Sequence, residues 1–228
     1  MDEKSKYLGL PAFWGRSKGS TLNFLFDKVA SKLKGWKQIC LSQAGREVLI
    51  KAVVQAIPTY AMMCFSLPMY FCKRLNSFVR NFWWGGVEDK SKINWKRWDV
   101  LTKPKFEGGL GFRDFKCFNR ALLAKQGWRL LTKPDAYWAI FLKAIYFPNC
   151  NFLEAKRGRR PSWIWSSLLE GREVLLSGAR LNIVSGENTR IWDDLWIPKN
   201  HAFKLTTPRL MSPPVLKVAD LVNRSKGM

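Results

Sequence analysis

The sequence from Leu22 to Trp36 reads LNFLFDKVASKLKGW. Its apolar residues recur at steps of three and four, which is the spacing of one face of an α-helix. The lysines fall off that face, and Gly35 is typical of the end of a helix. The stretch therefore predicts an amphipathic helix whose buried stripe consists of Leu22, Leu25, Phe26, Val29, Leu33 and Trp36.

Helical spacing continues beyond this stretch. Ser42 suits the N-cap of a second helix, because its hydroxyl can accept a hydrogen bond from a free backbone N–H. That helix should run to about residue 57, where Pro58 ends or kinks it, and a short apolar helix should follow up to Leu67 and Pro68. The residues expected to face inward in the second helix are Val48, Leu49, Ala52, Val53 and Ala56.

Four more helices are predicted, at about 70–84, 115–131, 135–147 and 162–176. Asp114 suits the N-cap of the second of these. Residues 87–113 look irregular, with Trp95 and Trp98 as anchors. Two short tracts, 181–184 and 189–192, flank Ser185-Gly186-Glu187-Asn188 and predict a β-hairpin. The fold class expected is mainly α, with a helical bundle followed by a smaller α+β segment that has a β-hairpin near 181–192.

The charge of the chain is strongly unbalanced. Its 228 residues include 39 Lys and Arg but 17 Asp and Glu, so the net charge is +22, and the excess is spread along the whole chain. Because 47% of residues are hydrophobic, a real core can form and the charge sits on a folded body. Nucleic acid is the natural partner of such a surface. An anionic membrane and a basic surface without a polyanionic partner are the alternatives.

Several kinds of site are disfavoured. The cysteines stand at 40, 64, 72, 117 and 150, and His201 is the single histidine, so the short paired spacings of a zinc site are missing and free thiols are expected. No cofactor or small-molecule substrate is expected. The N-terminus lacks an apolar segment and opens with acids, and the most apolar stretch, 60–67, is too short to span a bilayer. We expect an intracellular protein, in the nucleus rather than the mitochondrion.

Two motifs and the single histidine invite a functional interpretation as an active site or a phosphate-binding loop. Asp193-Asp194 could hold Mg²⁺, but it follows the bulky Trp192 and has no third carboxylate set up upstream, which favours a structural turn. Gly108-Gly109-Leu110-Gly111 lacks the Lys-Ser/Thr that a phosphate-binding loop requires. His201 has no evident Ser or Cys partner for nucleophilic catalysis.

Two basic tracts invite a binding interpretation. Lys156-Arg157-Gly158-Arg159-Arg160 can contact a phosphate backbone, act as a nuclear-targeting signal or form a solvated loop. Trp95-Lys96-Arg97-Trp98 interleaves aromatic rings with cations, which can stack on bases but is more often part of a core.

An ordered set of segments runs through most of the chain, over about residues 5–222. The segments are Tyr7-Leu8-Gly9-Leu10-Pro11, Gly35-Trp36-Lys37, Leu41-Ser42-Gln43-Ala44-Gly45-Arg46, Leu49-Ile50-Lys51, Ile57-Pro58-Thr59-Tyr60, Phe82-Trp83-Trp84-Gly85, 108–114, 119–126 and Trp192-Asp193-Asp194-Leu195-Trp196. In this order they resemble the region after the palm in plant LINE-type (non-LTR) retrotransposon reverse transcriptases, and a related reading frame occurs in isolation in plant mitochondrial genomes.

The resemblance implies roles by position. Tyr7 and Gly9 would belong to the primer grip, and residues 20–85 to a helical thumb that holds a template–primer duplex by its backbone, which suits an enzyme that copies any sequence. The nucleic-acid-binding residues expected are Tyr7, Gly9, Lys28, Lys32, Lys34, Lys37, Arg46 and Lys51, together with Arg157, Arg159 and Arg160 of the basic tract.

The resemblance also implies three regions and no catalysis. Residues 1–86 would be the primer-grip remnant and thumb-like bundle, 87–200 a helical connection region with the hairpin, and 201–228 a poorly ordered tail. The palm carboxylates, the endonuclease and the ribonuclease H domain of the family are not found in these residues. We therefore expect a non-catalytic fragment that binds nucleic acid, the alternative being a structural or protein-interaction relic.

Overall fold

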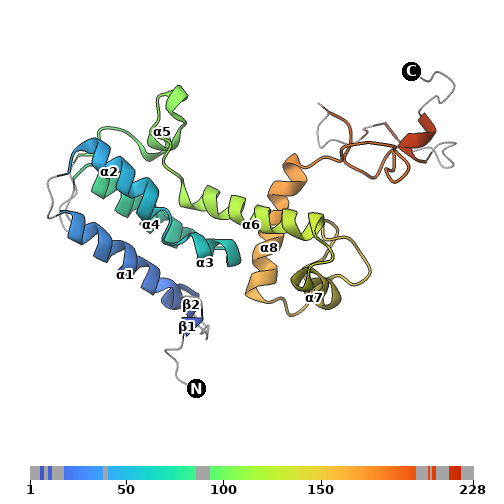
Figure 1. Ribbon diagram of the computed structural model, residues 1–228, viewed down its shortest axis with the longest axis horizontal. Coiled ribbons are helices and arrows are strands. Elements are labelled where there is room, and N and C mark those ends of the chain that lie inside the picture. The colour runs from blue at the N-terminus through green and yellow to red at the C-terminus, as the bar shows by residue number, and fades with distance from the viewer. Residues whose placement is uncertain are drawn as a thin grey trace. The chain divides into compact units, whose positions relative to one another are not determined.

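A computed structural model describes residues 6–7, 10–11, 18–37, 41–85, 93–198, 205, 207–208 and 216–221. Contacts divide the chain into two compact units, 1–172 and 173–228, and each is described by itself. The described residues are mainly helical, as the sequence predicts (Figure 1). The three regions expected from the resemblance, with boundaries near residues 86 and 200, are defined by their roles in a reverse transcriptase. Contacts within the chain do not test those roles, so the three regions stay a prediction.

The helices follow one another with short connections. The described residues form eight α-helices, two short strands and three shorter helical turns. The α-helices are α1 Lys18–Lys37, α2 Gln43–Leu49, α3 Thr59–Cys64, α4 Met69–Trp83, α5 Trp98–Thr102, α6 Phe115–Thr132, α7 Tyr137–Tyr146 and α8 Trp163–Gly178. The π-helix η1 spans Ile50–Val54, the 3₁₀ helices are η2 Lys105–Glu107 and η4 Val218–Leu221, and β1 Lys6–Tyr7 pairs antiparallel with β2 Leu10–Pro11.

The core of the first unit is built on α1 and α4. These helices contact each other, and α4 and α3 both contact α6 (Figure 1). The predicted stripe of α1 is buried, apart from the half-buried Trp36. Phe26 packs on Phe71 of α4 with their ring centroids 4.0 Å apart. Phe112 and Phe115 belong to the same core, which therefore extends beyond residue 86.

Both predicted N-caps are confirmed. The Gly45 N–H donates to Ser42 Oγ at 3.2 Å, and the Cys117 N–H donates to Asp114 Oδ1 at 3.0 Å. Each cap satisfies one of the N–H groups that a helix leaves without an internal partner, so α2 and α6 begin where the sequence predicts.

The predicted inward face of the second helix is confirmed at Leu49, which packs against the core, but is wrong at Val48, Ala52 and Ala56, which are exposed. Regular α-helix ends at Leu49 and continues as η1, where the Gln55 N–H donates to the Ile50 carbonyl at 3.0 Å, five residues back. This wider turn shifts the phase of the buried face. Val48 is therefore 62% exposed, while Ile50 and Val54 are fully buried.

A second aromatic cluster surrounds Trp165, which is fully buried. Tyr146 and Phe147 stack on its ring at centroid distances of 4.6 and 5.5 Å, and Phe152 meets it edge-on at 6.0 Å. The cluster ties the end of α7 and the following loop to the start of α8 (Figure 1). Stacked and edge-on aromatic pairs each add about 0.5–1.5 kcal/mol beyond their buried area.

The predicted β-hairpin at 181–192 is wrong. Residues 181–184 form no strand, and Leu181 bonds instead to the Leu195 carbonyl through its N–H, at 2.6 Å. The second tract pairs with a later segment: Arg190 and Lys217 form an isolated antiparallel bridge, flanked by the Val218 N–H bond to the Thr189 carbonyl at 2.9 Å. Residues 189–191 therefore pair with a segment distant in the sequence and not with the neighbouring residues 181–184.

The two expected tryptophan anchors behave differently. Trp98 stacks on Phe112 with ring centroids 6.0 Å apart, which confirms it as an anchor. Trp95 is 75% exposed, so its anchoring role is wrong. Residues 98–107, expected to be irregular, contain α5 and η2. None of the described helices is long and apolar enough to cross a membrane.

Candidate nucleic-acid interface

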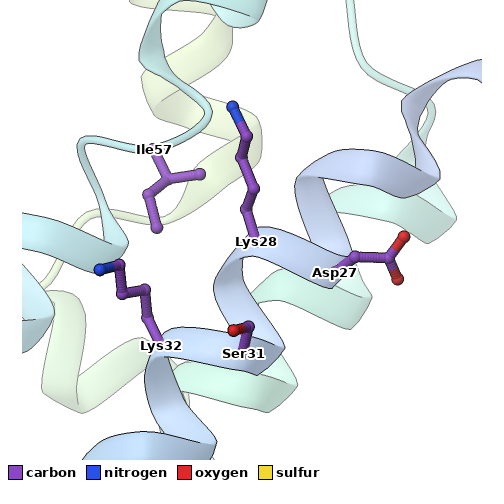
Figure 2. A pocket seen from close by; sticks show the side chains of 5 residues that line it. All are labelled: Asp27, Lys28, Ser31, Lys32 and Ile57. Atoms are coloured by element: carbon purple, nitrogen blue, oxygen red, sulfur yellow. The ribbon is translucent and has the colours of Figure 1, made fainter. Parts of the chain in front are cut away.

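Two of the predicted lysines lie together on α1. Lys28 and Lys32 are exposed and line a shallow hollow of about 450 Å³ together with Asp27, Ser31 and Ile57. Figure 2 shows both ammonium groups on the side of Ile57, while the Asp27 carboxylate turns away. Their four-residue spacing places them one turn apart on the same helical face. The pair can therefore contact two phosphates of one backbone.

The remaining residues of the predicted primer-grip and α1 set are not joined to this pair. Lys34 is exposed, but it lies two residues from Lys32 and so points to another side of α1. Tyr7 lies in β1, paired with Leu10. Gly9 lies outside the described residues, as does the side chain of Lys37.

Arg46 makes an internal contact. Its Nη1 donates to the Trp83 carbonyl at the end of α4, at 3.3 Å. The positive φ of Gly85, 74°, lets the chain turn beside the guanidinium, and a Cβ there would lie 3.0 Å from Arg46 Nη1. This half-buried guanidinium closes the C-terminus of α4, where cations are favoured.

Lys51 also has a partner within the protein. Glu47 accepts from Lys51 Nζ at 2.8 Å and from Lys105 Nζ at 2.9 Å. These hydrogen bonds, first that of Lys51 and then that of Lys105, hold the pKa of Glu47 below its usual value. Because Glu47 already neutralises part of this charge, Lys51 is a weaker candidate for a phosphate contact than Lys28.

Arg157 belongs to a second cluster of cations. It lines a groove of about 360 Å³ in the first unit together with Lys116 and Arg120 from α6. Arg159 and Arg160 are exposed in the same loop and do not line the groove. Lys116 and Arg120 were not predicted, although their four-residue spacing on an expected helix beside a basic loop was a usable pattern.

Buried hydrogen bonds fix the floor of this groove. Asn119, which is 3% exposed, accepts from the Leu67 N–H at 2.7 Å and donates to the carbonyls of Met62 and Phe65 at 2.7 and 2.9 Å. The Ser66 N–H donates to Ser167 Oγ of α8 at 2.8 Å. The connection from α3 to α4 is therefore held against α6 and α8.

The acidic pair has structural contacts. Asp194 Oδ2 accepts from the Arg190 N–H at 2.6 Å, and Asp193 Oδ2 lies 3.9 Å from Arg190 Nη1. These bonds close a turn, which supports the structural interpretation. No group of three or more His, Cys, Asp or Glu side chains that could hold a metal occurs among the described residues, and His201 lies outside them.

The glycine run also has a structural explanation. The Gly111 N–H donates to the Lys103 carbonyl at 2.8 Å, and a Cβ on Gly109 would lie 2.0 Å from that same oxygen. Only glycine permits this close approach of two backbone segments. The run therefore shapes the loop that leads into α6.

Of the described cysteines, Cys64, Cys72, Cys117 and Cys150 are free thiols. Burial, and then the negative charge of Asp114, raises the pKa of the Cys72 thiol to about 11. Such a thiol behaves as a small apolar group in the core.

The sequence matches no protein-family model. It is 33% identical over 193 residues to a protein of Arabidopsis thaliana named "Putative ribonuclease H protein"; the match covers 82% of this chain but 31% of that longer protein. It is 45% identical over 143 residues to an uncharacterized mitochondrial protein of Arabidopsis thaliana, covering 62% of this chain and 93% of the relative. Both relatives are consistent with a plant retrotransposon-derived protein. The chain belongs to the same family as that uncharacterized mitochondrial protein of Arabidopsis thaliana.

Proposed function

We propose that this chain is a non-catalytic nucleic-acid-binding segment derived from a LINE-type retrotransposon reverse transcriptase. In this proposal its first helices act as a thumb, and Lys28 and Lys32 of α1 contact the backbone of a template–primer duplex. Polymerase, endonuclease and ribonuclease H activities are not assigned to it.

The single observation that carries the proposal is the pair of lysines on α1. Both lysines line one hollow with the apolar Ile57, and Asp27, which also lines it, points its carboxylate away from their ammonium groups (Figure 2). The net charge of +22 supplies a favourable field for a polyanion over a longer range. Contacts to phosphates without base readout suit a surface that holds any sequence.

The longer Arabidopsis relative also supports a nucleic-acid ligand. Its name refers to ribonuclease H, an activity on nucleic acid, and this chain matches about a third of its length. We infer that the matched segment serves the longer protein by holding the nucleic acid.

Binding to a labelled DNA duplex at several salt concentrations tests the proposal. Each phosphate contact contributes about 0.9 to the slope of log affinity against log salt in duplex DNA. Lys28→Gln combined with Lys32→Gln should therefore lower the slope by about 1.8. Lys125→Gln with Lys133→Gln removes the same charge from exposed positions and serves as the matched control.

The outcomes separate clearly. Wild-type binding without a salt slope contradicts the proposal, and so does a Lys28/Lys32 variant that behaves like the control. Primer-extension and nuclease assays with Mg²⁺ address catalysis. We expect no product from the wild type and none from Asp193→Asn with Asp194→Asn; product that depends on these carboxylates would show the non-catalytic assignment to be wrong.

A protein-interaction role is the second candidate, and α7 favours it. One face of this helix carries Tyr137, Ile140, Phe141 and Ile145, which are 94%, 53%, 64% and 53% exposed. Contiguous exposed apolar side chains are characteristic of interaction surfaces. Sedimentation of the chain alone, compared with Ile140→Ser and Phe141→Ser, tests this candidate: association that both changes abolish, without any salt-dependent binding to nucleic acid, would favour it.

A further inference from the structure

We propose that the groove between the α3–α4 connection, α6 and α8 binds phosphates of a single nucleic-acid strand. The inference rests on the proposed function for the class of ligand, but it concerns a different surface from the Lys28–Lys32 pair. The groove is lined by residues 66–69, by Lys116, Asn119 and Arg120 of α6, by Arg157, and by Trp163, Ser166 and Glu170 of α8.

The charge of the groove favours an anion. Lys116, Arg120 and Arg157 come from two separate segments, and within the described part of the chain none of them forms an ion pair. Like charges gathered in one concave place repel one another, so a bound anion relieves the repulsion. The one lining carboxylate, Glu170, is hydrogen-bonded to Ser66 Oγ.

The donors match the chemistry of phosphate. A guanidinium presents several N–H groups in a planar fork and binds phosphate oxygens in pairs, while an ammonium adds a compact charge. The start of α4 also faces this groove through Pro68 and Met69, and no side chain caps it. The positive end of the helix dipole therefore adds to the field of the three cations.

The size of the groove selects a single strand. Its volume of about 360 Å³ lies in the range of roughly 300–1,000 Å³ that holds small ligands, so one nucleotide can enter whereas a duplex cannot. Trp163 packs on Phe65 with ring centroids 4.4 Å apart and lines the groove at the same time. Aromatic walls beside a basic track are the usual means of holding single strands without sequence preference.

The floor is rigid enough to keep these groups in place. Asn119 binds the chain at Met62, Phe65 and Leu67 through buried hydrogen bonds, and Ser167 fixes Ser66 from α8. Lys116 and Arg120 therefore project from a helix that is locked to the α3–α4 connection. A preorganised site of this kind loses little entropy when it binds.

The test compares a labelled oligo-dT strand with a DNA duplex of equal length, over a salt series, with the full chain. The groove variant combines Lys116→Gln, Arg120→Gln and Arg157→Gln, and the control combines Lys125→Gln, Lys133→Gln and Lys143→Gln, all at exposed positions. Single-strand affinity should fall at least tenfold in the groove variant relative to the control. The slope of log affinity against log salt should fall by about 2, because each of the three lost phosphate contacts contributes roughly 0.7 on a single strand.

Each result decides something. If the groove variant binds the single strand as the control does, the inference is wrong, while salt-dependent duplex binding through Lys28 and Lys32 would leave the proposed function standing. If the groove variant loses single-strand binding but the Lys28/Lys32 variant binds duplex normally, the groove stands, and the proposed thumb role of Lys28 and Lys32 on a duplex fails. If poly-glutamate displaced the labelled oligo-dT as effectively as unlabelled oligo-dT does, the groove would bind any polyanion and the assignment of nucleic acid as its ligand would be wrong. Should the triple variant melt earlier than the control, Arg157→Gln alone, in a loop, replaces it.

Discussion

Replacing Asn119 by alanine should strongly destabilise the first unit. The side chain is buried on α6 and makes three hydrogen bonds to the backbone of residues 62–67, at 2.7, 2.7 and 2.9 Å. These bonds hold the segment where α3 ends and α4 has not begun, so that segment cannot satisfy its backbone groups by regular helix. Alanine would leave the Leu67 N–H and the Met62 and Phe65 carbonyls without their hydrogen-bond partner.

The magnitude follows from the bonds. A hydrogen bond contributes about 1 kcal/mol net, so three give about 3 kcal/mol, and each buried group left unsatisfied costs roughly 1–3 kcal/mol. We expect Asn119→Ala to lower the free energy of unfolding by about 3–5 kcal/mol, a large part of the 5–15 kcal/mol typical of a domain. Asn119→Asp should also destabilise, because a carboxylate accepts from Leu67 but cannot donate to the carbonyls of Met62 and Phe65.

Urea unfolding followed by circular dichroism measures the effect, with Lys125→Ala on the same helix as an exposed control. A loss below 1 kcal/mol for Asn119→Ala would refute the reasoning, because it would mean that water or other groups replace the three bonds. The aspartate variant adds a second check, since a stability equal to that of the wild type would show that the two donated bonds contribute nothing.

Three further predictions concern packing, charge and thiol chemistry. Gly171→Ala should destabilise by about 1–3 kcal/mol in thermal unfolding, as overpacking does, because the new Cβ would lie 2.5 Å from the Leu123 carbonyl carbon where α8 crosses α6. Glu47→Gln should lower stability by about 0.5 kcal/mol at pH 7, because solvent screens both of its partly exposed ion pairs. Since the folded pKa of Glu47 is lowered, its contribution is present above the unfolded pKa and is lost as the pH falls through the folded value, so the wild type and the variant should converge in urea unfolding at low pH. Cys72, with its thiol pKa raised to about 11 by burial, should resist iodoacetamide at pH 8 in the native protein while the exposed Cys150 reacts, as peptide mass spectrometry would show.

Controls and contrary outcomes are available for each. Gly35→Ala in α1 meets no atom within 4 Å, so it should stabilise by up to about 1 kcal/mol; equal effects at the two glycines would contradict the close-crossing argument. A pH-independent difference between Glu47→Gln and the wild type would exclude the carboxylate as its cause. Native labelling of Cys72 as fast as Cys150 would show that its surroundings open readily.

Much of the helical fold was predictable because the pattern and the caps agree. The α1 stripe, Ser42 and Asp114 each use interactions between residues three or four apart, which a sequence displays directly. The buried face of the second helix was not predictable. The π-helix at Ile50–Val54 shifts which residues face the core, and no residue pattern in this stretch indicates a π-helix. The hairpin failed because residues 189–191 pair with 216–218, a choice that local sequence does not encode.

The residues of the candidate site also include some that the sequence predicts and some that only the fold brings together. Lys28 and Lys32 were predictable as neighbours, because one helical turn separates them. The sequence by itself determined the excess of positive charge, the period of the main helices and their caps, all of which depend on composition or on near neighbours. Only the tertiary structure decided that Arg46 serves an internal contact with Trp83 and that Arg157 meets Lys116 and Arg120 at one groove. The physical reason is that these contacts join residues roughly 40 positions apart in the chain, and only folding brings such residues together.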